Sequence, residues 1–330
     1  WGDAGMRLMN QKLKLYYVEK ALRELTDENH GLTIHQISDY LRAHDISAER
    51  KTLYSDMECL QLLGLDIKVE KGRSNTYKLV SREFELPEVK LLIDAVQSSA
   101  FITERKSRAL VKKLLGLVSA YNARRLEKQV FIANRNKTVN ESIYYNVDEL
   151  NNAIADGQKV SFLYSTYDLT KRRKLKNNGA PYVVSPYALC WDDENYYLVC
   201  RKEGQESLHH FRVDKISNVE RLQDRAEPCP RGFDPAGYAR SLFGMFGGEA
   251  VQATLRFDNS LIGVALDRFG PEIPIAIGDD SFTTTVVIAA SPVFFGWILQ
   301  LGGKAEVLGP PELREQLREH VSAAYALYEA

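Results

Sequence analysis

The stretch "ENYYLVCRKE" (Glu194–Glu203) decides how the middle of this 330-residue chain is interpreted. Two tyrosines follow a polar turn and lead into a short apolar run that ends in two basic residues. Alternate residues of a strand share one face. One face of this predicted strand therefore carries Tyr196, Leu198 and Cys200, and the other carries Tyr197, Val199 and Arg201.

The next apolar run, "LHHFRVDKI" (Leu208–Ile216), alternates in the same way. Its core face carries His209, Phe211 and Val213, so His210 and Arg212 are expected to point outward. If the two strands pair, the outward residues form one aromatic and basic patch, which suits a phosphate group plus a stacked base. The alternative is an exposed strand face that simply carries charge. The predicted patch consists of Tyr197, Arg201, His210 and Arg212.

Short alternating runs separated by Gly, Asn and Asp turns predict a small β-barrel around these two strands. The runs are "KVSFLYST", "APYVVSPYALCW", "NYYLVCRK" and "LHHFRVDKISNVERL". A Pro- and Gly-rich connection, residues 225–248, follows the barrel. The last segment, residues 249–330, has the pattern strand, helix, strand, strand or short helix, strand, helix, which predicts an α+β unit of ferredoxin-like size.

The N-terminal residues 7–83 show three amphipathic helical segments followed by two short strands. The segments cover residues 7–25, 33–41 and 48–63, and Asp45 and Ser47 are of the types that cap helices. The strands "DIKVEK" and "NTYKLV" are joined by "GRSN". This order predicts a winged helix-turn-helix. Residues 84–140 are predicted as a helical linker with two helices, in "VKLLIDAVQSSAFI" and "ALVKKLLGLVSAY".

The third helical segment gives the main nucleic-acid signal. With Leu53, Met57 and Leu60 inward, its exposed start presents groups that contact phosphates or guanine edges when such a helix enters a major groove. The following hairpin adds basic residues that can reach the neighbouring backbone. The alternative is a solvated charged face. The predicted DNA-binding residues are Arg50, Lys51, Thr52, Tyr54, Ser55, Lys71 and Arg73.

A second basic segment, "TKRRKLKNNG" (Thr170–Gly179), lies between two predicted strands of the barrel. One interpretation is a solvated charged loop. The other is a segment that borders a ligand groove and steers an anionic effector toward it.

Composition excludes several classes of protein. The net charge of −1 means that any basic site is a local cluster. The four cysteines form no CxxC pair, which argues against a zinc ribbon or a disulfide scaffold and fits a reducing cytoplasm. No apolar run has the length of a membrane span. No catalytic, metal-binding or cofactor-binding motif occurs, so neither an enzyme nor a cofactor is expected.

The quoted runs resemble the WYL domain of bacterial transcriptional regulators. Tyr196, Tyr197 and Leu198 stand where that family has Trp-Tyr-Leu, and Phe211–Ile216 ("FRVDKI") matches its Phe-Arg-Leu-Asp-Arg-Ile signature. The N-terminal segment resembles the winged helix of the same regulators, except that Ser55 replaces their usual Arg. "FFGWILQLGGKAEVLGPPELREQLREHV" (Phe294–Val321) resembles their C-terminal extension, called WCX.

The resemblance implies a multidomain α+β chain: a winged helix-turn-helix (7–83), a helical linker (84–140), a Sm-like small β-barrel or WYL domain (141–224), a linker (225–248) and a ferredoxin-like WCX domain (249–330). It implies a homodimer and a barrel that binds nucleotides or single-stranded nucleic acid. Tyr196 and Leu198 are then expected in the barrel core, with Tyr197 outward. The implied effector-binding residues are Tyr164, Ser185, Tyr197, Arg201, His210 and Arg212.

The expected function is that of a transcriptional regulator that binds double-stranded DNA and responds to an effector in its WYL domain. The alternative is an accessory module whose barrel binds RNA or single-stranded DNA and modulates a partner enzyme. The three-helix segment with its basic third helix favours the first hypothesis.

Overall fold

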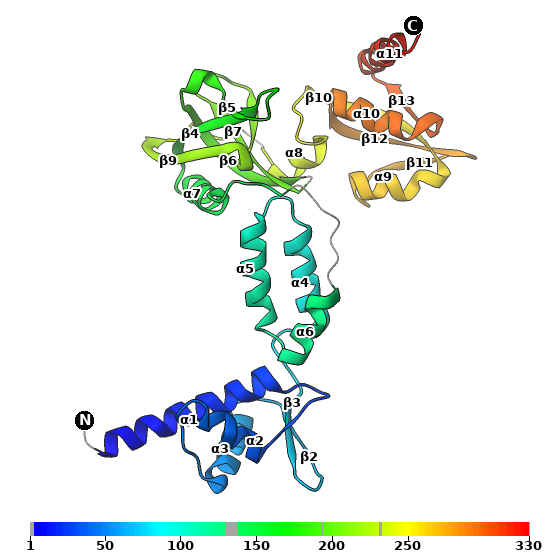
Figure 1. Ribbon diagram of the computed structural model, residues 1–330. Coiled ribbons are helices and arrows are strands. Elements are labelled where there is room, and N and C mark those ends of the chain that lie inside the picture. The colour runs from blue at the N-terminus through cyan, green and yellow to red at the C-terminus, as the bar shows by residue number, and fades with distance from the viewer. Residues whose placement is uncertain (1–2, 130–136, 193, 231–232, 330) are drawn as a thin grey trace. The chain divides into compact units, whose positions relative to one another are not determined.

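The structure, a computed structural model, describes residues 3–129, 137–192, 194–230 and 233–329. Contacts within the chain divide it into two compact units, residues 1–139 and residues 140–330. Both units combine α-helices with antiparallel sheets (Figure 1). The predicted linkers 84–140 and 225–248 each include a few residues that lie outside the described ranges.

The first unit begins with three helices and a small sheet around one apolar core. Helix α2 starts where the sequence predicts, because Thr33 and Gln36 cap each other's backbone N–H groups. Helix α3 starts at Arg50, and Asp45 and Ser47 do not cap it. A two-residue strand, β1, was not predicted. The elements are α1 (Asp3–Leu25), β1 (Leu32–Thr33), α2 (Ile34–Arg42), α3 (Arg50–Leu62), β2 (Ile67–Glu70) and β3 (Thr76–Leu79), with sheet order β1-β3-β2.

Three further helices follow in the described part of this unit, where the sequence predicted two. Gly116 ends one helix and Ser119 precedes the next, so "ALVKKLLGLVSAY" spans a break and not one helix. The helices α4 (Leu86–Ser98), α5 (Glu104–Leu115) and α6 (Ala120–Gln129) share a small core of Val89, Ile93, Val118 and Leu126.

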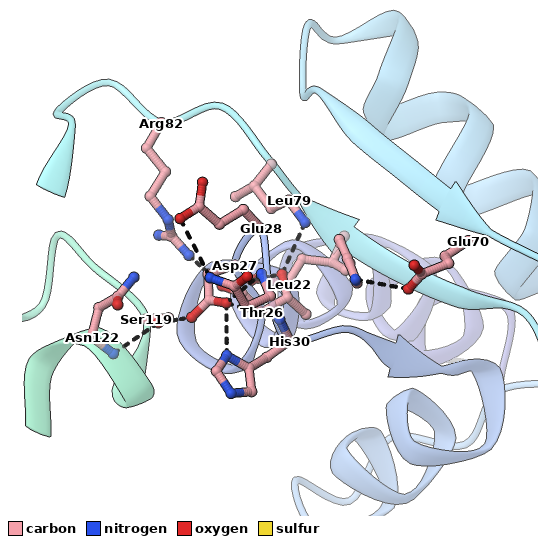
Figure 2. A network of polar contacts seen from close by, with 12 residues as sticks. Leu22, Thr26, Asp27, Glu28, His30, Glu70, Leu79, Arg82, Ser119 and Asn122 are labelled. Atoms are coloured by element: carbon pink, nitrogen blue, oxygen red, sulfur yellow. Dashed lines mark hydrogen bonds and ion pairs between the residues drawn. The ribbon is translucent and has the colours of Figure 1, made fainter. Parts of the chain in front are cut away.

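Buried polar contacts fasten the residues after α1 to the start of α6 (Figure 2). The Asp27 carboxylate accepts a 2.6 Å hydrogen bond from the Ser119 hydroxyl and lies 2.7 Å from His30 Nδ1. Burial raises the pKa of Asp27, but the hydrogen bonds from Ser119, His30 and the backbone outweigh it and lower that pKa. Arg82 donates to the Thr26 carbonyl at 2.6 Å. These polar contacts thus join the N-terminal helices to α4–α6, and we call them the polar junction.

The second unit opens with helix α7 (Ile143–Asp156), which Gly157 ends in the left-handed conformation. An antiparallel six-stranded sheet follows and curls into a half-barrel, in the order β5-β4-β6-β7-β8, with β9 also paired to β4. Its strands are β4 (Gln158–Tyr167), β5 (Arg173–Leu175), β6 (Tyr182–Asp192), β7 (Asn195–Lys202), β8 (Leu208–Arg212) and β9 (Ile216–Arg225).

The segment after the half-barrel is more ordered than a linker. It contains helix α8 (Pro235–Ser241), and its apolar residues pack on the sheet. Leu242 and Met245 are buried there against Tyr197 and Val199. One face of β7 is therefore covered by residues that follow it by about forty positions in the sequence.

The rest of the unit is a four-stranded antiparallel sheet with three helices, in the sheet order β11-β12-β10-β13. The fourth element of this segment was predicted as either a strand or a short helix, and the structure has both, β12 and α10. The buried residues include Leu255, Phe257, Phe282 and Phe294. The elements are β10 (Ala250–Asp258), α9 (Ile262–Phe269), β11 (Ile275–Ile277), β12 (Ser281–Ala289), α10 (Pro292–Gln300), β13 (Ala305–Gly309) and α11 (Pro311–Ala326).

Candidate functional sites

The exposed start of α3 carries the predicted DNA-binding residues of that helix. Leu53, Met57 and Leu60 are buried in the core of the first unit, as predicted. This packing turns the opposite side of the helix to solvent. The exposed side chains there are Arg50, Lys51, Thr52, Tyr54 and Ser55.

Local contacts hold this surface in a fixed arrangement. The Arg50 guanidinium donates a 3.3 Å hydrogen bond to the Tyr54 hydroxyl, one helical turn away. Thr52 donates its hydroxyl proton to the Glu49 carbonyl at 2.8 Å. No side chain caps the N-terminus of α3, so its first N–H groups, at the positive end of the helix dipole, remain available to an anion.

An ion pair reduces the negative charge of the same helix. Asp56 forms a 2.8 Å ion pair with Lys14 of α1, and both side chains are nearly buried. The Asp56 carboxylate is thereby neutralised and does not oppose the cations at the helix start. Glu49 and Glu58 remain exposed.

The hairpin β2–β3 brings two more predicted residues to the surface of the same unit. Lys71 and Arg73 are exposed in the turn between the strands. Tyr77 and Leu79 of β3 are buried in the core that also holds Leu53 of α3. One packed body therefore presents both the start of α3 and the hairpin turn.

The predicted pairing of β7 with β8 is confirmed. Arg212 lies opposite Tyr197, His210 opposite Val199, and Leu208 opposite Arg201. On the other side of β7, Ser185 lies opposite Arg201. Directly opposed residues of antiparallel strands share a face. Five of the six predicted effector residues, Ser185, Tyr197, Arg201, His210 and Arg212, therefore lie on one face of the sheet.

Tyr197 does not point outward as predicted, and this part of the face is not open. Its side chain is 9% exposed and packs with Leu242 and Met245. His210 Nε2 lies 3.0 Å from the Tyr238 hydroxyl of α8. Burial, with a smaller contribution from His209, lowers the pKa of His210 to about 4, so this ring is neutral at pH 7. The error arises because the covering segment was predicted as a linker.

The two arginines of this face are paired with carboxylates. Arg201 forms a 3.2 Å ion pair with Glu227, whose backbone N–H donates to the Ser185 hydroxyl at 2.9 Å. Arg212 donates twice to Asp214, at 3.0 Å each, and the hydrogen bond to this carboxylate raises the pKa of Arg212. An anionic ligand at either guanidinium would compete with these carboxylates.

Tyr164 lies apart from the other predicted effector residues. Its ring centroid is 4.9 Å from that of Phe211, which belongs to the opposite face of β8. Phe162 and Tyr182 join this aromatic cluster, and the Lys202 ammonium lies 5.3 Å from the Tyr182 ring centroid. Sequence reasoning missed Tyr182 and Lys202. Their positions in the alternation of β6 and β7 would have placed them on the face of Leu198.

The described residues hold no cluster of three or more His, Cys, Asp or Glu side chains able to bind a metal ion. Within the same ranges, every helix is too short or too polar to span a membrane.

Comparison with known proteins adds two domain assignments. The family model described as "WYL domain" matches residues 145–221, and the one described as "WCX domain" matches residues 249–325. A search of the curated proteins finds no match.

The solved structures that are similar to this chain include the following two. The first, "Proteasome accessory factor B/C (PafBC) of Arthrobacter aurescens", is 17% identical, with 96% of this chain and 49% of that chain covered and a TM-score of 0.29. The chain thus spans about half the length of that protein. The second, "Crystal structure of a CRISPR Cas-related protein", is 13% identical, with 73% and 72% covered and a TM-score of 0.35.

Proposed function

We infer that this chain, which contains a WYL domain and a WCX domain, is a transcriptional regulator that binds double-stranded DNA through its first unit. In this proposal residues 7–83 act as a winged helix-turn-helix, and residues 249–330 form a ferredoxin-like WCX domain. The protein binds DNA as a homodimer, and it regulates transcription without catalysing a reaction.

The observation that carries the proposal is the surface at the start of α3. Arg50, Lys51 and Thr52 are exposed at the N-terminus of a helix whose other side packs into a three-helix core. The first residues of a recognition helix are those that contact base edges in a major groove. The hairpin turn with Lys71 and Arg73 supplies contacts to the adjacent phosphates.

The WYL domain supplies the proposed response to an effector. A nucleotide or a short nucleic acid carries phosphates that can replace Glu227 and Asp214 as partners of Arg201 and Arg212. Such a ligand regulates DNA binding only if it binds two conformations of the dimer unequally. Since α8 covers Tyr197 and His210, we propose that binding at this face involves movement of residues 233–246.

The proposal is tested by fluorescence anisotropy on a labelled duplex from the region upstream of the protein's own gene. The variant Arg50→Ala/Lys51→Ala is compared with Lys112→Ala/Lys113→Ala, which removes the same charge from exposed positions of α5. We expect selective duplex binding that only the first variant loses. Its preference for the cognate sequence should fall, because each lost contact to a base edge costs about 1–3 kcal/mol of discrimination.

Equal binding by the wild type and the α3 variant would contradict the proposal. Binding of single-stranded oligonucleotides without any selective duplex binding would favour the accessory module instead. Multi-angle light scattering at the concentrations used for binding tests the proposed homodimer.

A further inference from the structure

A pocket in the second unit is lined by two opposite charges and an aromatic wall. Its volume of about 480 Å³ lies within the roughly 300–1,000 Å³ that is typical of small-molecule sites. Helix α10 forms one side, and its lining residues recur at the three- and four-residue spacing of a single helical face. These residues are Val293, Gly296, Trp297 and Gln300. We call this cavity the α10 pocket.

Arg268, in the last turn of α9, brings a positive charge to the α10 pocket. Its guanidinium carbon lies 3.8 Å from the centroid of the Phe243 ring, and Nη2 donates to the Leu242 carbonyl at 2.5 Å. Nε is buried and has no hydrogen-bond partner, and no carboxylate among the described residues forms an ion pair with Arg268. Burial lowers the pKa of this guanidinium. A charge withdrawn from water is costly unless it is paired, so Arg268 favours a ligand with an anionic group.

A negative charge lines the same pocket. Asp192, the last residue of β6, acts electrostatically on the Arg268 guanidinium, although no ion pair joins these two described side chains. A purely anionic ligand would be attracted by Arg268 and repelled by Asp192, and a purely cationic ligand would experience the reverse. A zwitterion satisfies both residues, because its anionic group pairs with the guanidinium and its cationic group with the carboxylate.

The wall of the α10 pocket beside these charges is apolar and held in place. The Trp297 ring packs against Phe243 and Phe269, with ring centroids 5.3 and 5.6 Å away. Val293 lies one helical turn before Trp297 on the same face of α10. A Cβ atom added at Gly296 would meet no other atom within 4 Å, so there is open space beside this face. Such a wall favours an apolar group on the ligand.

We propose that the α10 pocket binds an α-amino acid with an apolar side chain. The carboxylate of the amino acid pairs with Arg268, its ammonium group pairs with Asp192, and its side chain packs against Trp297. The proposal goes beyond the proposed function, because it requires neither the α3 surface nor the face that contains Arg201 and Arg212. Its test needs no nucleic acid, so the two proposals fail separately.

A structural role accounts for only part of this arrangement. By stacking on Phe243 and bonding to the Leu242 carbonyl, Arg268 holds the residues after α8 against α9. That role uses one terminal nitrogen and the plane of the guanidinium. It explains neither the second charge, from Asp192, nor the open space beside Gly296.

The test is titration calorimetry of the full chain with L-phenylalanine and, separately, with L-leucine. Two analogues of each probe separate the charges. Hydrocinnamate and isocaproate lack the ammonium group, and phenethylamine and isoamylamine lack the carboxylate.

Two variants place the same new side chain inside and outside the pocket. Gly296→Leu fills the α10 pocket from its helical wall. Gly263→Leu is the matched control, because it also puts leucine at a helical glycine whose added Cβ would meet no atom within 4 Å, but on α9 and away from the pocket lining. A third variant, Asp192→Asn, removes the negative charge with little change of shape. Arg268 is left intact because it also holds Leu242, and circular dichroism checks that each variant is folded.

We expect the wild type to bind at least one of the two amino acids with a Kd below about 1 mM, and to bind its two analogues at least about tenfold more weakly. Gly296→Leu should weaken binding of the amino acid by at least about tenfold, and Gly263→Leu should bind like the wild type. Asp192→Asn should also bind the amino acid at least about tenfold more weakly. The same variant should bind the carboxylate analogue more tightly than the wild type does, because the repulsion is gone.

Three results would overturn the proposal. Binding of neither amino acid by the wild type would leave Arg268 with its structural role alone. Equal binding by Gly296→Leu and Gly263→Leu would place the bound amino acid outside the α10 pocket. A carboxylate analogue that binds the wild type as tightly as the amino acid would identify a site for simple anions, in which Asp192 has no part.

Discussion

The Ser119 hydroxyl donates a 2.6 Å hydrogen bond to the buried carboxylate of Asp27, although 92 positions separate the two residues. A second contact lies beside it, where the His30 and Tyr121 rings stack with centroids 3.8 Å apart and planes 1° apart. Together these contacts attach α6 to the residues that follow α1. The proposed DNA-binding helices and the helical segment are thereby coupled within one unit.

Loss of the Ser119 hydroxyl should weaken this junction. In Ser119→Ala, Asp27 keeps its negative charge in a buried position but loses one donor, which costs about 1–3 kcal/mol of stability. Hydrogen exchange of the first unit in the full chain measures the effect, and the Leu79 N–H, which donates to Thr26, reports on it directly. Ser98→Ala, on α4, serves as the control and should change stability by less than about 0.5 kcal/mol. Equal protection in both variants would show that the junction contributes nothing.

Arg82 should not tolerate replacement by lysine. Its two terminal nitrogens donate to three carbonyls: Nη2 to those of Arg23 and Thr26, at 2.8 and 2.6 Å, and Nη1 to that of Leu117 at 3.5 Å. Burial lowers the pKa of its guanidinium. Both Arg82→Ala and Arg82→Lys should destabilise the first unit, the alanine variant by about 2–3 kcal/mol, because an ammonium group lacks the planar fork of donors. Thermal unfolding compared with Arg124→Ala, an exposed position of α6, measures this. If Arg82→Lys unfolded at the same temperature as the wild type, the planar arrangement of donors would not be required.

The second unit should lose stability in mild acid because of His210. Its pKa is lowered to about 4 in the folded protein, whereas an unfolded histidine titrates near 6.5. The unfolded chain therefore binds more protons between these values, and stability falls as the pH drops from about 6.5 to about 4, by about 3 kcal/mol. Denaturant unfolding of the wild type and His210→Gln across this range measures the difference.

The control is His35→Gln, which removes a histidine of the first unit and leaves His210 in place. The second unit should keep its pH dependence in this variant, because His35 lies outside it. A wild type and His210→Gln with parallel stability profiles would show that His210 titrates normally and that its contact with Tyr238 is open to water.

The four thiols should divide into two classes. Cys59 and Cys229 are exposed, whereas Cys190 and Cys200 are buried, and burial raises the pKa of both buried thiols. Because the thiolate is the reactive form, the native protein should release two equivalents of thionitrobenzoate rapidly from Ellman's reagent, and the unfolded protein four. Rapid reaction of a third thiol would mean that residues 233–246 uncover Cys190 readily, as an opening of the proposed effector face requires.

The polar junction around Asp27 shows what sequence reasoning could not find. Periodicity predicted the first three helices of this unit and the inward positions of Leu53, Met57 and Leu60. It placed residues 109–121 in one helix and so missed the break before α6, where the Ser119 hydroxyl is free to reach Asp27. Contacts across 92 positions leave no periodic signal, because they depend on how whole helices pack.

For the half-barrel, alternation in the sequence was enough to predict which residues share a face. Alternation along β7 and β8 placed Tyr197, Arg201, His210 and Arg212 together, and the strand register confirms it. Alternation, however, shows only that two residues lie on the same face of a strand. It does not show whether that face is exposed to water or covered by another segment. Packing in the folded chain makes this distinction: α8 and the residues after it bury Tyr197, whereas Tyr167, at the end of β4, stays exposed.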